Sequence, residues 1–231
     1  MPMRKKGGST ESVDNYLKAI LSLGGVEESR VTIKALAEHL SVAPASVTNM
    51  LQKLAAASAP LVKYERHGGV KLSRSGKKRA LEIVRHHRLI ETFLYRILDY
   101  PLEEVHAEAE RLEHFISERF EERIAAKLGH PTIDPHGHSI PTLTGQIAAS
   151  ESILLTDVFD TGTFRIDSVS DRDVRHVRWM EARGITPGAR LQVRSTPSAA
   201  GYSLTVGRSG KPFVLPHEVA QQVRIVKLGG N

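Results

Sequence analysis

The sequence predicts a mainly α-helical fold with small β parts: an N-terminal winged helix-turn-helix, a helical middle region and a C-terminal β-barrel. Three observations predict this class. Apolar residues recur at helical spacing in five segments before residue 129, one short segment alternates around a Gly-Gly pair, and short β-like runs begin at residue 152. A chain of 231 residues is long enough for two or three small domains.

The first three helices are expected near the N-terminus. Residues 11–23, residues 32–40 (TIKALAEHL) and residues 45–57 (ASVTNMLQKLAAA) each place apolar side chains on one helical face. Residues 41–44, Ser-Val-Ala-Pro, separate the second segment from the third. Two short helices around such a tight connection are typical of a helix-turn-helix.

A β-hairpin is expected directly after these helices. Residues 61–73 (LVKYERHGGVKLS) alternate apolar and polar side chains around Gly68 and Gly69, which is a hairpin pattern. A hairpin that follows a helix-turn-helix is the wing of a winged helix. The sequence therefore predicts a DNA-binding domain over residues 1–74.

The middle region is expected to hold two longer helices, residues 77–98 and 102–128, with a turn at 99–101. The stretch 129–145 is rich in proline, glycine and histidine and is expected to be a loop. These segments predict a helical domain over residues 75–145.

The sequence pattern changes from helical to β-like after a linker near residues 141–151. Its β-like runs are separated by Gly/Pro turns and are interrupted by one short helix, residues 171–183. The runs are FRIDSVS, RLQVRST, YSLTVG, FVLP and QVRIVKL. This pattern predicts a small β-barrel domain over residues 152–231.

The composition excludes several classes of protein. Because the chain has no cysteine, a disulfide framework, a zinc–thiolate site and a cysteine nucleophile are excluded. Nothing approaches eighteen uninterrupted apolar residues, so no membrane span is expected. The basic opening is not followed by an apolar signal-peptide region. A cytoplasmic protein is the expectation.

Charge is distributed unevenly along the chain. Residues 29–90 contain 12 Lys/Arg against 3 Asp/Glu, whereas residues 101–130 contain 4 against 8. A basic block followed by an acidic, histidine-bearing block suggests one surface for a polyanion and one site for a cation. Two solvated faces of opposite sign would give the same counts, so charge alone leaves both interpretations open.

The second helix of a helix-turn-helix enters the major groove, so its N-terminal side chains are expected to meet the bases. Asn pairs with adenine through two hydrogen bonds, and small residues approach the thymine methyl group. The residues expected at base edges are Ala45, Ser46 and Asn49. Those expected near phosphates are Thr48, Lys53, Lys34, Arg30, Lys63, Arg66 and Lys71. The alternative is that Thr48 and Asn49 are simply exposed helix residues.

The acidic region also carries side chains suited to a metal ion. At 100° per residue, four of them fall within an arc of roughly 100° on one helix. These are His106, Glu110, Glu113 and His114. His87 and Glu91 form an i,i+4 pair on the preceding helix. Imidazole and carboxylate without thiolate suit Mn²⁺, Fe²⁺ or Zn²⁺, although such pairs on an acidic helix are often only solvated.

Several motifs stand together in this region: RHHRLIE at 85–91, VHAEAERLEH at 105–114 and DPHGHSIP at 134–141. With ESVDNYLKAI and VAPASVTNMLQKL before them, they resemble the diphtheria toxin repressor family of iron- and manganese-dependent regulators over about 140 residues. The remainder resembles the SH3-like domain of its longer members. The resemblance implies a metal-activated transcriptional repressor, with a helical dimerisation and metal domain, that binds palindromic double-stranded DNA as a homodimer.

The resemblance also implies two metal sites. His87, Glu91 and His106 match the ligands of one site. The second site is matched by Glu110, Glu113 and His114, together with a ligand from the N-terminal helix. Iron-type members commonly have Cys at the position of Glu110, and manganese-type members have Glu. A hard carboxylate favours Mn²⁺ over Fe²⁺, with other divalent transition metals expected to bind in vitro.

The chain departs from the family pattern at the N-terminal helix. The ligand position there is Met in iron types and Asp in manganese types, but here it is Asn15, beside Asp14. Lys18 stands where some manganese members have an acid. The SH3-like domain of iron types lends an acid and an amide to the first site, and Asp173 and His176 are the counterparts expected here. The histidines interpreted as loop residues rather than ligands are His130, His136 and His138.

Two other functions are conceivable for the same residues. A metallohydrolase using His106, Glu110 and His114 lacks the His-Glu-x-x-His motif and an evident nucleophile, so no enzyme is expected. A metal-independent winged-helix regulator, whose acidic helix serves only dimerisation, stays open. Dependence of DNA binding on added metal separates this regulator from a metal-activated repressor.

Overall fold

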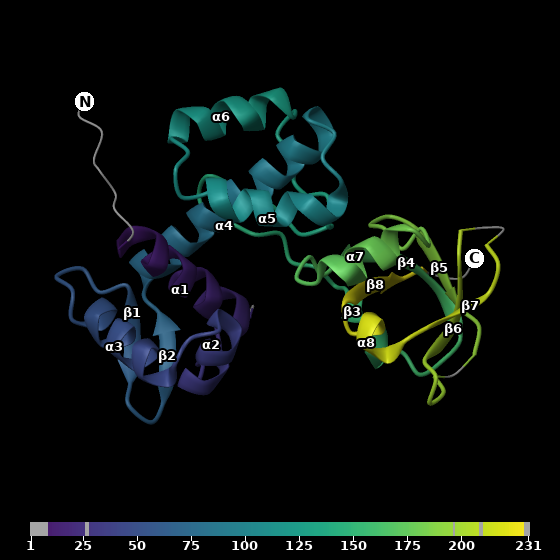
Figure 1. The fold of residues 1–231 in the computed structure, drawn as a ribbon, viewed down its shortest axis with the longest axis horizontal. Coiled ribbons are helices and arrows are strands. Elements are labelled where there is room, and N and C mark those ends of the chain that lie inside the picture. Colours follow the sequence, from purple (N-terminus) through teal and green to yellow (C-terminus); the bar gives the residue numbers. More distant parts are fainter. Residues whose placement is uncertain (1–8, 26–27, 196, 208–209, 229–231) are drawn as a thin grey trace. The chain divides into compact units, whose positions relative to one another are not determined.

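The computed structural model describes residues 9–25, 28–195, 197–207 and 210–228 (Figure 1). The chain divides into two compact units, each with its own apolar core. The first unit comprises residues up to His86 with Glu113–Phe115 and Pro141–Gln146. The second comprises His87–Leu112, Ile116–Ile140 and the residues from Ile147 onward.

The first unit contains the predicted winged helix. Its elements are α1 (Ser9–Gly24), α2 (Ile33–Leu40), α3 (Pro44–Ala55), β1 (Val62–Glu65) and β2 (Gly69–Leu72). Thr32 begins α2 as its N-cap, because its hydroxyl accepts the N–H of Ala35 at 3.1 Å. Ser41 ends α2 in the left-handed conformation, with a φ of 53°, and Pro44 stands in the first turn of α3. Local sequence therefore defines the helix-turn-helix.

Apolar side chains from all five elements form the core of this unit. Leu17, Leu36, Val47 and Leu51 are fully buried within it. The wing strands pair antiparallel, and Gly69 turns the chain with a φ of 80°. A Cβ at Gly69 would lie 2.6 Å from a backbone oxygen, so the wing requires glycine at this position.

The helical region contains α4 (Arg74–Ile97), α5 (Leu102–Leu112) and α6 (Glu118–Lys127). The boundary between the two units falls within α4. Two small apolar clusters of the second unit hold these helices together. One is centred on Leu89, Ile124 and Ile140, and the other joins Leu94 to Val105.

The prediction of one continuous helix over residues 102–128 is wrong. The chain leaves the helix after Leu112 and starts α6 at Glu118. Ser117 is the N-cap of α6, because its side chain accepts the N–H of Phe120 at 3.3 Å. The break contains neither glycine nor proline, so its one sequence signal is a serine followed by acidic residues.

The C-terminal region is the predicted small β domain. Its elements are β3 (Ile153–Leu154), the 3₁₀ turn η1 (Leu155–Asp157), β4 (Gly162–Val169), α7 (Val174–Glu181), β5 (Arg190–Val193), β6 (Tyr202–Val206), β7 (Phe213–Leu215), α8 (His217–Ala220) and β8 (Val223–Lys227). The strands form one antiparallel sheet in the order β3-β8-β4-β5-β6-β7. Ile166, Leu191 and Leu204 are fully buried in its core. The sequence patterns did not predict β3 or α8.

Strand β4 leads into α7, the helix of this domain that packs against α5. It carries a bulge at Asp167, since Ile166 pairs with Ile225 whereas Ser168 pairs with Arg224. The strand ends at Val169, and α7 packs against α5. The short connection between β4 and α7 therefore lies beside the helical region.

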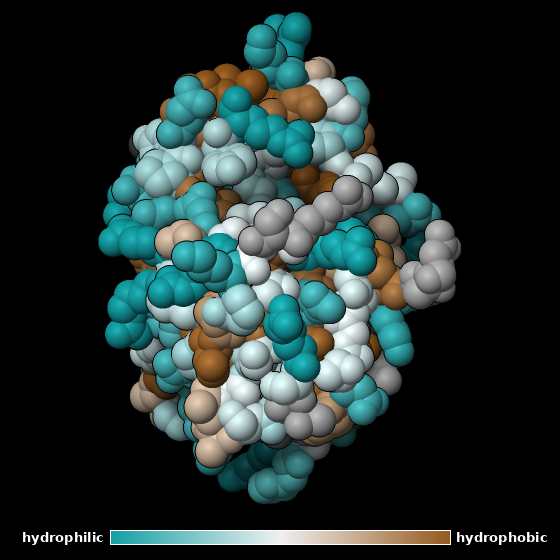
Figure 2. Space-filling model, turned by 90° about the vertical axis from the view of Figure 1, so that its right-hand side faces the viewer, coloured by the Kyte–Doolittle hydropathy of each residue, from teal (hydrophilic) through white to brown (hydrophobic). Residues whose placement is uncertain are grey.

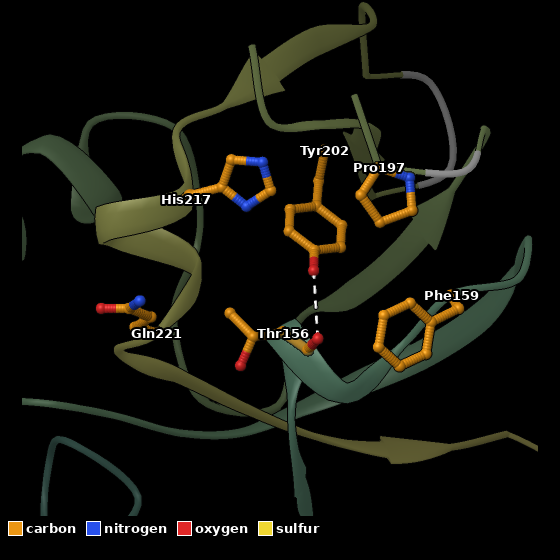
Figure 3. Close-up of a pocket in the computed structure, with 6 residues that line it drawn as sticks. All are labelled: Thr156, Phe159, Pro197, Tyr202, His217 and Gln221. Carbon is orange, nitrogen blue, oxygen red and sulfur yellow. Dashed lines mark hydrogen bonds between the residues drawn. The ribbon is translucent and has the colours of Figure 1, made fainter. Parts of the chain in front are cut away.

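A pocket of the C-terminal domain lies between α8, η1 and the start of β6 (Figure 3). The hydroxyl of Tyr202 donates to the backbone oxygen of Thr156 at 3.2 Å across it. The other lining residues are Phe159, Pro197, His217 and Gln221. None of the six belongs to the predicted ligand sets.

The surface shows hydrophobic residues in small separate areas among hydrophilic ones on the face that Figure 2 presents. The exposed apolar side chains of the helical region include Ile97, Leu98, Leu112 and Phe120. A search of the described residues finds no helix with both the length and the apolar character needed to cross a membrane.

Candidate metal centre and DNA-binding surface

Helices α4 and α5 bring three predicted ligands of the first site together. His87 Nε2 lies 2.9 Å from Glu91 Oε1 and 3.1 Å from His106 Nδ1. His106 Nδ1 and Glu91 Oε1 are 3.3 Å apart. Glu91 has no exposed surface and His87 is also buried. The i,i+4 spacing on α4 thus aims both side chains at the same point on α5.

The fourth member of this cluster is Asp171, from the connection between β4 and α7. Its Oδ2 lies 3.4 Å from His106 Nδ1. One donor atom from each of His87, Glu91, His106 and Asp171 lies within 4.8 Å of the others. The C-terminal domain therefore supplies an acid, as the resemblance implied, but from a different residue.

The structure corrects the expectation for Asp173 and His176. Asp173 is the N-cap of α7, where its carboxylate accepts the backbone N–H groups of Arg175 and His176. The ring of His176 contacts the amide of Gln222 instead. Because the carboxylate of Asp173 caps its own helix, it does not point at the cluster. The acid that reaches the cluster is Asp171, two residues earlier.

The charges of neighbouring side chains determine the pKa values of the residues in this cluster. Burial alone would raise the pKa of Glu91, but the charge of His87 and the contacts with His106 and His136 hold that pKa well below its usual range. Burial opposes the charged form of His106, yet Asp171 and Glu91 raise the pKa of His106 to about 10. The pKa of Asp171 is lowered by the neighbouring histidines, although burial opposes this. The cluster without metal is therefore held together by protonated imidazole.

The first cluster fits a divalent transition-metal ion. Its two imidazoles and two carboxylates are the donors that Mn²⁺, Fe²⁺ and Zn²⁺ accept. Glu91 Oε2 is buried without a hydrogen-bond partner among the described residues. An unsatisfied buried charged oxygen costs more than about 1–3 kcal/mol, so a bound cation would remove a real penalty.

The second predicted set is not one face of a helix, because α5 ends at Leu112 and Glu113 and His114 lie in the turn that follows. Glu110 belongs to the second unit, where its Oε1 is 3.9 Å from His87 Nδ1. Glu113 and His114 belong to the first unit.

Within the first unit, α1 contacts Glu113 and His114. Lys18 Nζ donates to both carboxylate oxygens of Glu113, at 2.7 and 2.8 Å. Asp14 Oδ2 lies 3.5 Å from His114 Nδ1, and Asp14 Oδ1 accepts from Arg79 at 2.5 Å. Burial would raise the pKa of Asp14, but contacts with His114 and Arg79 lower it. These pairs connect the N-terminal helix to the turn after α5.

This set does not fit a divalent ion at Glu113 while the Lys18 pair is in place. The Lys18 ammonium already provides a positive charge at the fully buried Glu113 carboxylate. Asn15 Oδ1 and both ring nitrogens of His114 are nevertheless buried without a hydrogen-bond partner among the described residues. Lys18, which departs from the family pattern in the sequence, therefore places its own ammonium beside Glu113, where it acts as an internal cation.

His136 lies in the expected loop, but it is not an exposed residue. Its side chain has no exposed surface, and its Nδ1 lies 3.8 Å from Glu91 Oε1. Burial alone would lower the pKa of His136, but the nearby Glu91 carboxylate raises it. The pKa of His136 therefore lies above its usual value. His130 is exposed and His138 is partly buried, its Nδ1 3.4 Å from Asp134 Oδ2.

The residues predicted to bind DNA lie on α2, α3 and the wing of the first unit. The exposed members are Ala45, Ser46, Asn49, Lys53, Lys34, Lys63 and Arg66. Thr48 is partly buried and its hydroxyl donates to the backbone oxygen of Pro44 at 3.1 Å. Lys34 Nζ lies 3.9 Å from Glu38 Oε1. Arg30 forms an ion pair with Glu65 of β1 and so stabilises the wing. The surface expected from the sequence is thus presented largely by side chains open to solvent.

Profiles of known families match three consecutive parts of the chain. Residues 9–70 match the iron dependent repressor N-terminal DNA-binding domain, and residues 73–142 match its metal-binding and dimerisation domain. Residues 153–227 match the FeoA domain. The predicted fold class, with its winged helix, helical region and SH3-like β domain, is confirmed.

Relatives extend this match over nearly the whole chain. The iron-dependent repressor IdeR of Mycobacterium leprae is 30% identical over 233 residues, covering 94% of this chain and 98% of the relative. The regulator MntR of Bacillus subtilis is 36% identical over 110 residues, covering 47% of this chain and 74% of the relative. A solved manganese-dependent transcriptional repressor in complex with manganese has a TM-score of 0.85 and 36% identity, covering 94% of this chain and all of the other. The chain therefore belongs to the iron-dependent repressor family, whose members are metal-dependent, DNA-binding transcriptional repressors and not enzymes.

Proposed function

We propose that this repressor responds to Mn²⁺ in preference to Fe²⁺, through a site formed by His87, Glu91, His106 and Asp171. The observation that carries the proposal is the convergence of four donor atoms around a buried carboxylate whose Oε2 has no hydrogen-bond partner among the described residues. A bound ion would supply, in place of the imidazole protons, the positive charge that the buried carboxylates need. Two further observations support Mn²⁺: the solved neighbour is a manganese-dependent repressor in complex with manganese, and this sequence offers no thiolate.

The four residues act by joining separate elements. His87 and Glu91 come from α4, His106 from α5 and Asp171 from the connection after β4. Holding them together restricts the movement of these elements. In a homodimer, the restricted form is the one whose two winged helices match successive major grooves, about 34 Å apart. Metal thus shifts a population toward this form, with a coupling of about 1–3 kcal/mol.

The protein's partners and location follow from the same assignment. The exposed apolar side chains of the helical region suit a homodimer interface. We place the domain boundaries at residues 1–74, 75–145 and 152–231, which the matched ranges support. A repressor of metal-responsive operators acts in the cytoplasm. The alternative, a metal-independent regulator, would need the first cluster to be purely structural.

Counting bound ions tests the site. The electron paramagnetic resonance signal of free Mn²⁺ is followed as the ion is titrated into the full chain. His106→Ala is expected to lose one bound ion per protomer, whereas the matched loop variant His130→Asn keeps it. An unchanged number of ions and an unchanged affinity in His106→Ala would exclude this cluster as the effector site.

Metal binding is expected to release protons. Because the pKa of His106 is about 10 in the metal-free cluster, His106 is protonated at pH 7.5 and must lose its proton to bind an ion. Affinity for Mn²⁺ should therefore fall as the pH falls. Calorimetric titrations in buffers of different ionisation enthalpy measure the release, expected to be about one proton per ion or more. A binding enthalpy that is the same in every buffer would contradict the displacement of a proton from His106.

The DNA-contacting residues predict two separable defects. Asn49→Ala is expected to weaken operator binding by about 1–3 kcal/mol and relax base preference at one position. Lys53→Ala should weaken all duplexes alike and reduce the slope of log affinity against log salt by about one. Fluorescence anisotropy at several salt concentrations distinguishes them. If the wild type and both variants have the same slope of log affinity against log salt, Lys53 does not contact a phosphate.

A further inference from the structure

We propose that the solvent-facing side of strands β4 and β5 binds the phosphate backbone of the DNA duplex, in addition to the contact made by the winged helix. Three exposed arginines lie on this side of the sheet: Arg165, Arg190 and Arg194. We call this surface, together with Thr163 and Gln192 among the arginines, the arginine face. The inference goes beyond the proposed function, because it assigns a role in DNA binding to the C-terminal domain.

The register of the two strands places the arginines next to one another. Arg165 on β4 lies directly opposite Arg190 on β5, and Thr163 lies opposite Gln192 (Figure 1). Side chains alternate between the two sides of a strand, so Arg190, Gln192 and Arg194 point the same way. The residues between them are buried in the core of the domain. Three cations therefore share one side of two adjacent strands.

The positive charge of the arginine face is largely uncompensated. Arg190 and Arg194 form no ion pair within the part of the chain that the structure describes, and Arg165 has one acid nearby, Asp167 Oδ1 at 3.5 Å. Residues 162–227 contain 11 Lys/Arg against 5 Asp/Glu. Like charges directly opposite each other on antiparallel strands destabilise the pairing. A bound polyanion would remove this repulsion.

The composition of the arginine face favours a phosphate backbone over an acidic protein. Arginine, threonine and glutamine side chains all donate hydrogen bonds to phosphate oxygens, and arginine can donate two at once. A protein–protein interface has apolar or aromatic residues at its core, and none of the five side chains of this face is apolar.

The spacing of the arginines also suits a duplex. Arg190 and Arg194 are four residues apart in an extended chain, about 13 Å. One DNA strand carries a phosphate about every 3.4 Å along the helix axis, so each arginine can contact a phosphate of its own. Because the winged helix of the same chain binds DNA, phosphates are present at a high effective concentration for a weak second contact.

The salt dependence of DNA binding tests the inference. Fluorescence anisotropy follows binding of the full chain, with saturating Mn²⁺, to a duplex selected from a random pool and extended by about one helical turn on each side. Arg190→Gln/Arg194→Gln should lower the slope of log affinity against log salt by about two per protomer, and Arg190→Gln alone by about one. Between about 50 and 200 mM salt, the wild type should lose about tenfold more affinity per protomer than the double variant.

Two control variants separate a phosphate contact from general effects of charge. Lys211→Gln removes an exposed charge of the same domain, near the start of β7, which β6 separates from β5. This variant should keep the wild-type slope. Arg190→Lys/Arg194→Lys keeps both charges and should retain the slope, since counterion release depends on charge. The Mn²⁺ count and the unfolding transition of every variant are expected to match those of the wild type.

A wild-type slope in Arg190→Gln/Arg194→Gln would overturn the proposal, as would an equal loss of slope in Lys211→Gln. A wild-type slope together with weaker self-association, measured by sedimentation, would assign the arginine face to an acidic protein surface instead. Because all chains are compared in the same buffer, the difference in slope does not depend on whether Mn²⁺ is the physiological effector. Failure of this inference is therefore distinguishable from failure of the proposed function.

Discussion

Replacing Glu91 by glutamine is expected to abolish the metal response of DNA binding. The substitution keeps the shape of a fully buried side chain but removes the charge that His87 and His106 surround. With excess Mn²⁺, the variant should bind operator as weakly as the chelator-treated wild type, a loss of about 1–3 kcal/mol or 5- to 150-fold. The probe is a duplex selected from a random pool with the Mn²⁺-loaded wild-type chain, and anisotropy measures the affinity.

The same variant should have a pH-dependent stability defect without metal. The folded pKa of Glu91 lies well below its unfolded value of about 4.3, so its charge stabilises the fold above that pH. This stabilisation is lost as the pH falls through the folded pKa. Glu91→Gln should therefore be less stable than wild type at pH 7 and approach it in acid. Glu108→Gln, on α5, is the matched control, and a full Mn²⁺ response in Glu91→Gln would refute the assignment.

Replacing Lys18 by methionine should destabilise the metal-free protein and create a new dependence on divalent ions. The change removes the ammonium to which both oxygens of the fully buried Glu113 carboxylate are bonded. Breaking a buried pair costs about 3–5 kcal/mol, and we expect the lower end because Lys18 is 17% exposed. A cation at Glu113, His114 and Asn15 would then restore stability, by about 2.7 kcal/mol at one hundred times its dissociation constant.

Unfolding monitored with and without Mn²⁺ measures both effects. Lys77→Met is the control, because Lys77 pairs with Glu28 on the surface, where such a pair contributes about 0–1 kcal/mol. Lys18→Met should also bind one more Mn²⁺ per protomer than wild type. If Lys18→Met is as stable as wild type and no more responsive to Mn²⁺, then Lys18 does not act as an internal cation.

The winged helix and the shared helix face of His87 and Glu91 could be predicted because their signals are local. Helical periodicity with Pro44 located the helix-turn-helix, and the Gly68-Gly69 pair located the wing. The i,i+4 spacing of His87 and Glu91 depends only on helix geometry. Features that depend only on neighbouring residues could therefore be predicted from the sequence.

The remainder of the site depends on contacts between distant segments. The break after Leu112, which moves Glu113 and His114 off the helix, has no glycine or proline to mark it. Asp171 could not be chosen over Asp173, because only the start of α7 decides which acid caps the helix. The burial of His136 within its loop could not be predicted, because it results from packing against β4, about thirty residues along the chain.

The central claim is that metal held by the His87, Glu91, His106 and Asp171 cluster controls DNA binding. The most direct test titrates Mn²⁺ into the chelator-treated full chain with the selected duplex present and follows anisotropy. We predict that affinity rises at least fivefold as Mn²⁺ is added and falls back when chelator is restored. Equal affinity with Mn²⁺ and with chelator would contradict the claim and identify a metal-independent regulator.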